Sequence, residues 1–152
     1  RTMAIQIISK SLSFTYIGGK SIYALPHIIR CQTDASFSRK GIFISALAIR
    51  PNSTRIEKLV QKYGITDSTE AEWASIHLGL VTCMEENYSV IGIENDNLSI
   101  ISQHIFKDNM PHRAYAKHCR HKIYELAKNT SWTGVRWIPR ELNHADEILR
   151  RG

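Results

Sequence analysis

The chain has 152 residues, of which 43% are hydrophobic and 22% charged, a composition typical of one soluble globular domain with a sizeable core. No apolar run approaches the roughly 20 residues that a membrane-spanning helix needs, so we expect no membrane partner. The net charge of +6 is unevenly distributed, because residues 1–100 carry ten Lys and Arg against nine acids, whereas residues 101–152 carry ten against five. A localised positive field attracts polyanions and binds their phosphates. Nucleic acid is therefore the partner that we expect.

The cysteines are few and widely spaced, and none of them forms a C-x-x-C motif. Their number is odd, so the pattern indicates neither a disulfide framework nor a zinc site. A reducing compartment fits this usage best, and we expect an intracellular, cytoplasmic protein. The three are Cys31, Cys83 and Cys119.

Residues 1–27 are predicted to form a β-hairpin extension packed on the main domain. Residues 3–9 and 12–17 have the pattern of strands, the Gly pair at 18–19 favours a tight turn, and residues 20–25 return as a strand. Seven apolar residues between positions 5 and 17 must be buried somewhere. Either the main sheet or a second subunit could bury these residues. The chain is therefore compatible with a monomer or with a dimer through the hairpin.

Residues 28–152 are predicted to form an α/β domain whose mixed five-stranded sheet is flanked by helices. Three strands are followed by helices that alternate with strands, which is the pattern of such a domain. The predicted strands cover 27–37, 42–50, 55–64, 88–96 and 132–139, with a short helix as the alternative at 55–64, and the predicted helices cover 67–84, 97–106, 112–129 and 142–151.

Two acidic residues at strand ends are candidate metal ligands. Asp34 lies at the far end of the first strand of the main domain, and Asp96 ends an apolar strand just before a helix, where ligand sites of α/β sheets usually lie. Glu94 points the same way as Asp96 by strand alternation. A carboxylate beside an apolar strand needs a compensating partner, and oxygen ligands without Cys or His favour Mg²⁺ or Mn²⁺. The alternatives are an Asx turn at Asp34 and a helix N-cap at Asp96.

Glu70 and Glu72 compete for a third position on the helix that begins near Asp67. Asp67 and Glu70 have capping-box spacing, as do Thr69 and Glu72, so either Glu could serve the helix start. The two point about 200° apart around the helix, so only one faces a site next to the sheet. Glu72 shares its face with a glycine that permits close approach of a neighbour, which favours Glu72.

Asp146 on the last predicted helix is the fourth candidate. Its alternative role is a surface ion pair with Arg150 at i+4. The histidines of the 112–129 helix are surrounded by Lys and Arg, so a solvated basic face is favoured there over a zinc site.

The order of these motifs resembles the ribonuclease H type 1 family. T-D-A-S around Asp34, T-E-A-E-W around Glu72, G-I-E-N-D-N around Asp96 and R-E-L-N-H-A-D ending at Asp146 look like the family's four acidic motifs in the family's order, over residues 28–151. Related reverse-transcriptase-like domains of plants share the same motifs. The resemblance implies a ribonuclease H-like fold and an endonuclease that hydrolyses the RNA strand of RNA/DNA hybrids.

The resemblance also implies a cofactor and residue roles. Two Mg²⁺ ions are expected, with Mn²⁺ as the other candidate; Asp34 would bridge both ions, Glu72 and Asp96 would bind one, and Asp146 the other. The family's mobile histidine has no counterpart, because almost no loop separates the last strand from the last helix. Arg140 or His144 is the possible auxiliary residue in its place.

Further residues are expected to contact nucleic acid. Polar side chains near the acids would meet the RNA strand, and basic side chains of the 112–129 helix would hold phosphates, with a solvated helix face as the alternative for the basic set. They are Ser36, Thr69, Asn97 and Gln103, and Arg113, Lys117, Arg120 and Lys122.

Two other functions stay open at this point. A resolvase- or integrase-like nuclease would keep the fold and change the substrate, although the chain is short for the extra segments of many such enzymes. A non-catalytic nucleic-acid-binding or assembly module would use the acids only as helix caps. The presence of all four acids argues against this second alternative.

Overall fold

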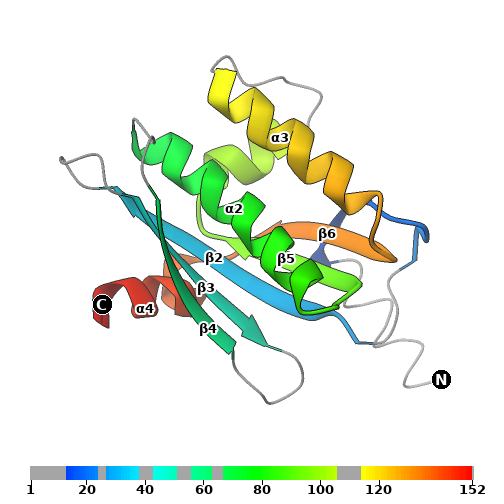
Figure 1. Cartoon of the computed structure of the whole chain (residues 1–152), viewed down its shortest axis with the longest axis horizontal. Helices are drawn as coiled ribbons and strands as arrows, with labels where there is room; N and C mark the ends of the chain where they lie inside the picture. The colour runs from blue at the N-terminus through cyan, green and yellow to red at the C-terminus, as the bar shows by residue number, and fades with distance from the viewer. Residues whose placement is uncertain are drawn as a thin grey trace.

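Six strands and three α-helices follow one another in the part of the chain that the computed structural model describes, which is residues 13–23, 27–37, 43–50, 56–62, 67–105 and 114–151. The order of elements agrees with the α/β pattern predicted for the main domain (Figure 1). The strands are β1 Thr15–Gly18, β2 Ile29–Phe37, β3 Phe43–Arg50, β4 Ile56–Lys62, β5 Val90–Asn95 and β6 Trp132–Trp137. The helices are α2 Ser68–Glu85, the π-helix η1 Ile100–Ile105, α3 Ala114–Ala127, the 3₁₀-helix η2 Arg140–Leu142 and α4 His144–Arg151.

The strands form one mixed sheet in the order β1-β6-β5-β2-β3-β4. β5 runs parallel to β2 and β6, whereas the β2-β3, β3-β4 and β1-β6 pairs are antiparallel. The mixed α/β sheet is therefore confirmed. It has six strands because β1, from the N-terminal segment, extends the five strands of the main domain.

The described N-terminal segment joins this sheet instead of folding back on itself. β1 pairs with β6, and Gly19, with a φ of 137°, turns the chain. The next two residues donate backbone N–H bonds of 3.1 and 2.9 Å to the loop before β6. Residues 20–23 thus form no strand, unlike the predicted return strand over 20–25, because the backbone donors of its first two residues bond to that loop instead of to β1. The predicted strand over 3–9 lies outside the described residues, and the domain boundary after residue 27 stays a prediction.

Both ends of helix α2 lie within one residue of the predicted helix over 67–84. The Asp67 side chain accepts the N–H of Glu70 at 2.9 Å and caps the start. At the other end Asn87 takes a positive φ of 66°. The N–H groups of Asn87 and Tyr88 return to carbonyls of the last turn, each at 3.0 Å, which is the bonding pattern of a Schellman motif.

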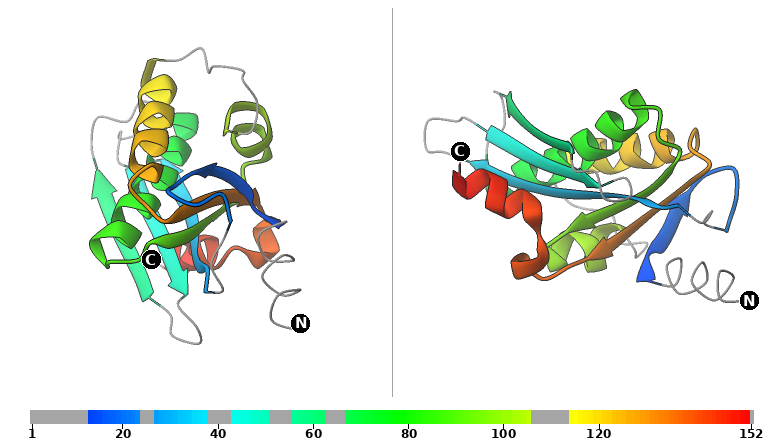
Figure 2. Two further views of the ribbon diagram at one scale, coloured as in Figure 1. Left: turned by 90° about the vertical axis from the view of Figure 1, so that its right-hand side faces the viewer. Right: turned by 90° about the horizontal axis from the view of Figure 1, so that it is seen from below.

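The main core lies between the sheet and helices α2 and α3, which cover one face, whereas α4 lies on the other face (Figures 1 and 2). This arrangement explains why α2 is apolar on nearly every side: it packs against both the sheet and α3. The core includes Trp73, Ile76 and Leu80 of α2, Ile91 and Ile93 of β5, Val135 of β6 and Ile123 of α3. The three cysteines all lie within the described ranges, where each is buried and none forms a disulfide.

The strand β2 is longer than its parallel neighbour. Pairing with β5 extends only to Gln32, whereas pairing with β3 continues to Phe37. Asp34 therefore lies within β2 and not at its far end as predicted, because β3 supports three further residues. Its side chain still lies beyond the end of the β2-β5 ladder, at an edge where other side chains can approach.

None of the helices in the described ranges is long and apolar enough to cross a membrane.

Candidate metal and active site

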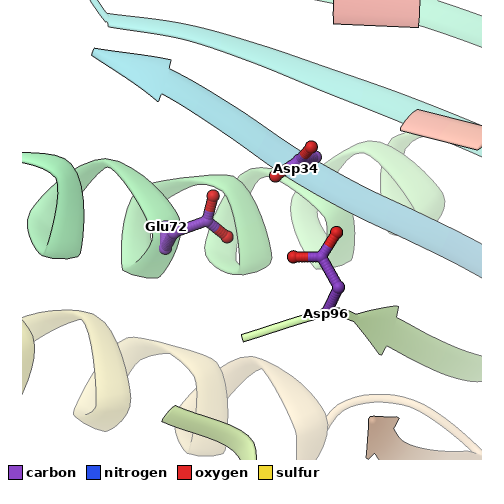
Figure 3. Close-up of side chains that lie close together, drawn as sticks. All are labelled: Asp34, Glu72 and Asp96. Carbon is purple, nitrogen blue, oxygen red and sulfur yellow. The ribbon is translucent and has the colours of Figure 1, made fainter. Parts of the chain in front are cut away.

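Three carboxylates from three elements converge beside the carboxyl end of β5. Asp34 lies on β2, Glu72 on the first turns of α2, and Asp96 directly after β5. One oxygen from each lies within 4.8 Å of the others, and Figure 3 shows the three side chains gathered between β2, α2 and the end of β5. The structure thus brings together three of the four predicted acids, here called the acidic triad.

The position of Glu72 follows from the start of α2. Since the cap at Asp67 fixes the first turn, Glu72 faces the sheet, where the backbone N–H of Ala35 donates to Glu72 Oε1 at 3.1 Å. The same N–H lies 2.9 Å from Asp34 Oδ1. One backbone donor is therefore shared by two carboxylates, which holds them next to each other.

Two buried asparagines that the sequence reasoning did not single out hold the other members of the triad. Asn95 Nδ2 donates to Glu72 Oε2 at 3.1 Å and to Thr33. Asn143 Nδ2 donates to Asp96 Oδ2 at 3.1 Å and to the carbonyl of Thr33 at 3.0 Å. Asn143 does belong to the R-E-L-N-H-A-D motif, whereas nothing in the sequence indicated that Asn95 points toward Glu72.

Asp96 is not the helix cap that its position also suggested. The side-chain oxygen of Asn97 accepts the N–H of Ile100 at 3.1 Å, and that of Asn95 accepts the N–H of Asn97 at 2.8 Å. Because the asparagines on either side perform the capping, the carboxylate of Asp96 is available to the triad.

Asp146 lies on α4 with its carboxylate between two arginines. Its oxygens lie 3.3 Å from Arg140 Nε and 3.2 Å from Arg150 Nε, so the predicted i+4 ion pair forms. The negative charge of Asp146 raises the pKa of Arg140. Asp146 nevertheless lines the same hollow of 420 Å³ as the triad. That hollow is bounded by Asp34, Ala35, Ser36, Glu72, Asp96, Arg140, Asp146, Leu149 and Arg150.

Burial and mutual repulsion make the triad hard to ionise. Burial raises the pKa of Asp34 to about 9, and the charges of Glu72 and Asp96 push it the same way. Burial also raises the pKa of Glu72 and of Asp96. Asp34 is only 7% exposed, so water compensates its charge poorly.

These observations fit a divalent cation. The donors are carboxylate oxygens from separate elements, the donor type that hard cations such as Mg²⁺ and Mn²⁺ prefer. Crowded carboxylates that are costly to ionise together are stabilised by a cation between them. The acidic triad can therefore bind a divalent metal, whereas Asp146 lines the same hollow and pairs with the two arginines.

The other predicted site residues fall into two groups. Ser36 lines the hollow of the acids, whereas Thr69 and Asn97 line a neighbouring hollow of 410 Å³. Both hollows are bounded by Ala35, Glu72 and Asp96, so they adjoin each other across the triad. Away from them lie the exposed Lys117 and Lys122 and the half-buried Arg120 on α3, with the Arg120 guanidinium 4.8 Å from the Tyr124 ring. Gln103 belongs to η1, and Arg113 lies outside the described residues.

The two candidates for the auxiliary residue, Arg140 and His144, differ in their position relative to the hollow. Arg140 lines the hollow and contacts Asp146. His144 begins α4, and its Nδ1 lies 3.5 Å from Glu147 Oε2. Arg140 is therefore the better placed of the two. Glu94, although it precedes Asp96 by two residues, is fully buried and pairs with arginines instead of joining the triad.

Comparison with known proteins gives a family and a fold. The model of the family described as reverse transcriptase-like matches residues 32–149. The structure is similar to the RNase H1 of the halophilic archaeon Halobacterium salinarum, with a TM-score of 0.70 and 14% identity over 80% of this chain and 92% of that one. A search of curated protein sequences gives no match.

Two further solved structures share this fold. The N-terminal RNase H domain of a Mycobacterium tuberculosis protein has a TM-score of 0.69 and 17% identity over 80% of this chain and 89% of that one. LC11-RNase H1, isolated from compost, was solved in complex with an RNA/DNA hybrid and has a TM-score of 0.63 and 19% identity over 78% of this chain and 91% of that one. The fold predicted from the four acidic motifs is therefore confirmed.

Proposed function

Since this chain belongs to the reverse transcriptase-like family and has a ribonuclease H-like fold, we propose that it is a metal-dependent endonuclease that hydrolyses the RNA strand of RNA/DNA hybrids. One observation carries this proposal, which is the convergence of three carboxylates within 4.8 Å beside a hollow that a fourth carboxylate also lines. A protein with the same fold, LC11-RNase H1, was solved with an RNA/DNA hybrid, and this supports the choice of substrate.

In the proposed site Asp34, Glu72 and Asp96 would hold one Mg²⁺ ion, and Asp34 together with Asp146 would hold a second. When bound, the ions supply electrostatic stabilisation to the attacking and leaving oxygens of an in-line displacement at phosphorus. The protein's own part is to hold the four carboxylates in place. Ala35, Asn95 and Asn143 do this for Asp34, Glu72 and Asp96 through the hydrogen bonds described above.

The arginines beside Asp146 have a second proposed task. Arg140 and Arg150 both line the hollow, with side chains 73% and 71% exposed, so their guanidinium groups can reach a phosphate there. When Asp146 turns toward a metal, the positive charge of both arginines becomes available to the nucleic acid backbone. Arg140 is the proposed auxiliary residue on this ground.

The two adjoining hollows suggest a path for the RNA strand across the triad. Ser36 lies on one side of the triad, and Thr69 and Asn97 lie on the other, so we propose that the RNA strand crosses the triad between them. Hydroxyl and amide groups can bond to the 2′-hydroxyl groups that distinguish RNA from DNA. The basic side chains of α3 are proposed to hold phosphates farther along the duplex.

A substrate panel tests the proposal. The purified chain is incubated with an RNA/DNA hybrid, a double-stranded RNA and a double-stranded DNA of one sequence, each with Mg²⁺ and with EDTA. We expect Mg²⁺-dependent cleavage of the RNA strand of the hybrid, leaving a 3′-hydroxyl. Preferential cleavage of double-stranded DNA would favour a resolvase-like nuclease, and binding of the duplexes without cleavage would favour a non-catalytic module.

A further inference from the structure

A charged group is buried in the sheet beneath the candidate site. Glu94 on β5 is 0% exposed and lies two residues before Asp96, on the face opposite α2 and α3. Arg30 of β2 pairs with its Oε1 at 3.0 Å, and Arg136 of β6 pairs with its Oε2. With two guanidinium partners, the carboxylate of Glu94 is held as an acceptor of fixed orientation.

Arg136 is itself held from the other side. Its Nη1 donates to Ser13 Oγ at 2.8 Å, and its guanidinium carbon lies 4.3 Å from the centre of the Phe14 ring, a cation–π distance. The residues just before β1 therefore fix Arg136, which in turn fixes Glu94.

Gln32 connects Glu94 to the segment that carries Asp146. The Gln32 side chain is fully buried, and its Nε2 donates to Glu94 Oε1 at 3.1 Å and to the Leu142 carbonyl at 3.2 Å. Its Oε1 accepts the backbone N–H of His144 at 3.0 Å. Both ends of one amide are thus used: the nitrogen bonds to β5 and to the end of η2, and the oxygen bonds to the start of α4.

Only one orientation of the Gln32 amide satisfies these partners. Glu94 Oε1 and the Leu142 carbonyl can only accept, whereas the His144 N–H can only donate. If the amide were turned over, the Gln32 oxygen would face the oxygens of Glu94 and Leu142. Its NH₂ group would then face the N–H of His144, another donor. Glu94 and the Leu142 carbonyl together therefore determine that the oxygen of Gln32 faces the start of α4.

The His144 N–H is one of the first donors of α4, and such donors have no partner within their own helix. The next donor, the N–H of Ala145, is satisfied by Asn143 Oδ1 at 3.0 Å. Local and distant side chains thus cap α4 together, and Asp146 follows within the same turn. The place of Asp146 relative to Asp34 consequently depends on a β2 side chain two residues before Asp34.

We infer that Gln32 is a positioning residue for Asp146, fixing the start of α4 while Glu94 fixes the orientation of Gln32. This inference rests on the proposed function in one respect, namely that Asp146 contributes to metal binding. Gln32 itself is neutral and fully buried, and it lines neither of the two hollows.

The test compares Gln32→Met, which keeps the length of the side chain and loses its hydrogen bonds, with Thr133→Val. Thr133 is also fully buried, and its hydroxyl lies 2.6 Å from that of Thr130, away from α4, so its replacement controls for the loss of a buried hydrogen bond. Amide hydrogen exchange is measured at His144 and Ala145, and Mg²⁺ affinity is measured by calorimetry. Both variants are also combined with Asp146→Asn.

In the wild-type protein we expect the His144 N–H to be protected from exchange. In Gln32→Met its exchange should accelerate and Mg²⁺ affinity should fall about tenfold, the usual order for loss of a group that orients a metal ligand. Thr133→Val should change neither quantity. In the Asp146→Asn background, Gln32→Met should lower Mg²⁺ affinity no further, because the ligand that Gln32 positions is already lost.

Three results would overturn the inference: an unprotected His144 N–H in the wild-type protein, equal Mg²⁺ affinities in Gln32→Met and Thr133→Val, or an undiminished effect of Gln32→Met in the Asp146→Asn background. The first needs no variant, so it applies even when Gln32→Met does not fold. Absence of Mg²⁺ binding by the wild-type protein would instead contradict the proposed function, and protection of His144 would still support the contact between Gln32 and α4.

Discussion

At the scale of single residues, the acidic triad is a place where the metal-free protein is unfavourably charged. Asp34, Glu72 and Asp96 are buried or half-buried, and each has a raised pKa. The fold therefore stabilises their neutral forms until a cation is bound. This makes the stability of the metal-free protein depend on pH in a direction that can be predicted.

We expect Asp34→Asn to stabilise the metal-free protein progressively as pH rises. The pKa of Asp34 is raised from 3.8 to about 9 on folding, so between these values the folded chain retains a proton that the unfolded chain has lost. Wild-type stability contributed by this group then decreases with rising pH, whereas Asn does not titrate. Urea unfolding in EDTA should show the gain of the variant over wild type growing from about pH 5 to about pH 8. A constant difference would mean that Asp34 ionises with an ordinary pKa.

Glu70 and Glu72 should respond differently to replacement by Gln. Glu70→Gln changes a residue of the first turn of α2, where the cap of Asp67 on its N–H remains, so it should cost at most about 1 kcal/mol and little activity. Glu72→Gln should lower hybrid cleavage by about two orders of magnitude or more without lowering the metal-free stability. Cleavage assays and urea unfolding of the two variants give the comparison. Exchanged phenotypes would show that Glu70 is the metal ligand.

The triad could be predicted from sequence because the local pattern around each acid indicates its element. Asp34 and Asp96 follow strand patterns, and Glu72 lies on a defined face of a predicted helix. The residues that hold the acids could not be predicted in this way. Asn95, Asn143 and Gln32 act through partners 23 to 112 positions away in the chain. Those contacts depend on the register of β2 against β5, which no local pattern specifies.

At the scale of elements, α3 presents basic side chains on the surface, away from the acids. Lys117 and Lys122 are exposed, and Arg120 is half-buried beside Tyr124. The sequence predicted this helix and its charge. Its distance from the two hollows follows from the packing of α3 beside α2, so it suits contact with a duplex that extends beyond the site.

Replacing Lys117, Arg120 and Lys122 by Gln should weaken hybrid binding and flatten its dependence on salt. Each lost phosphate contact should reduce the slope of log affinity against log salt by about 0.9, while the bond that is cut stays the same. Lys128→Gln is the control, because Lys128 directly follows α3 and is paired with Glu125 at 3.0 Å. Binding titrations over a series of salt concentrations measure the slope. A slope equal to that of the wild type would place the duplex elsewhere.

The strands show where element prediction succeeded and where it did not. β2, β3, β4, β5 and β6 follow patterns of apolar residues that the sequence displays. The partner of β1 was not predictable, because a short apolar strand can pair with a returning strand or with any open edge. In this fold the open edge of β6 takes it.

At the scale of the whole molecule, the described N-terminal residues are part of the main sheet and its packing. The Phe14 side chain is 7% exposed and meets the Trp132 ring edge-on at 6.1 Å. A Cβ added at Gly92 would come within 2.5 Å of the Phe14 ring, so the glycine makes room for it. This apolar side chain is therefore buried on its own chain.

Phe14→Ala should destabilise the protein by about 3 kcal/mol, as expected for removal of a buried aromatic side chain. Tyr23→Ala is the control, since Tyr23 is 74% exposed and its loss should cost less than about 0.5 kcal/mol. Urea unfolding at one pH measures both. Equal stabilities would mean that the segment before β1 contributes nothing to the folded domain.

Metal binding by the acidic triad is proposed to support cleavage of RNA in a hybrid, and the rate of hybrid cleavage as a function of Mg²⁺ concentration measures this dependence. The comparison is between the wild type, Asp34→Asn, and Glu147→Gln as a control for loss of an exposed acid of α4. We predict that Asp34→Asn lowers the rate by about two to three orders of magnitude at every Mg²⁺ concentration, whereas Glu147→Gln keeps the wild-type rate. An Asp34→Asn protein that cleaves the hybrid at nearly the wild-type rate would contradict the account.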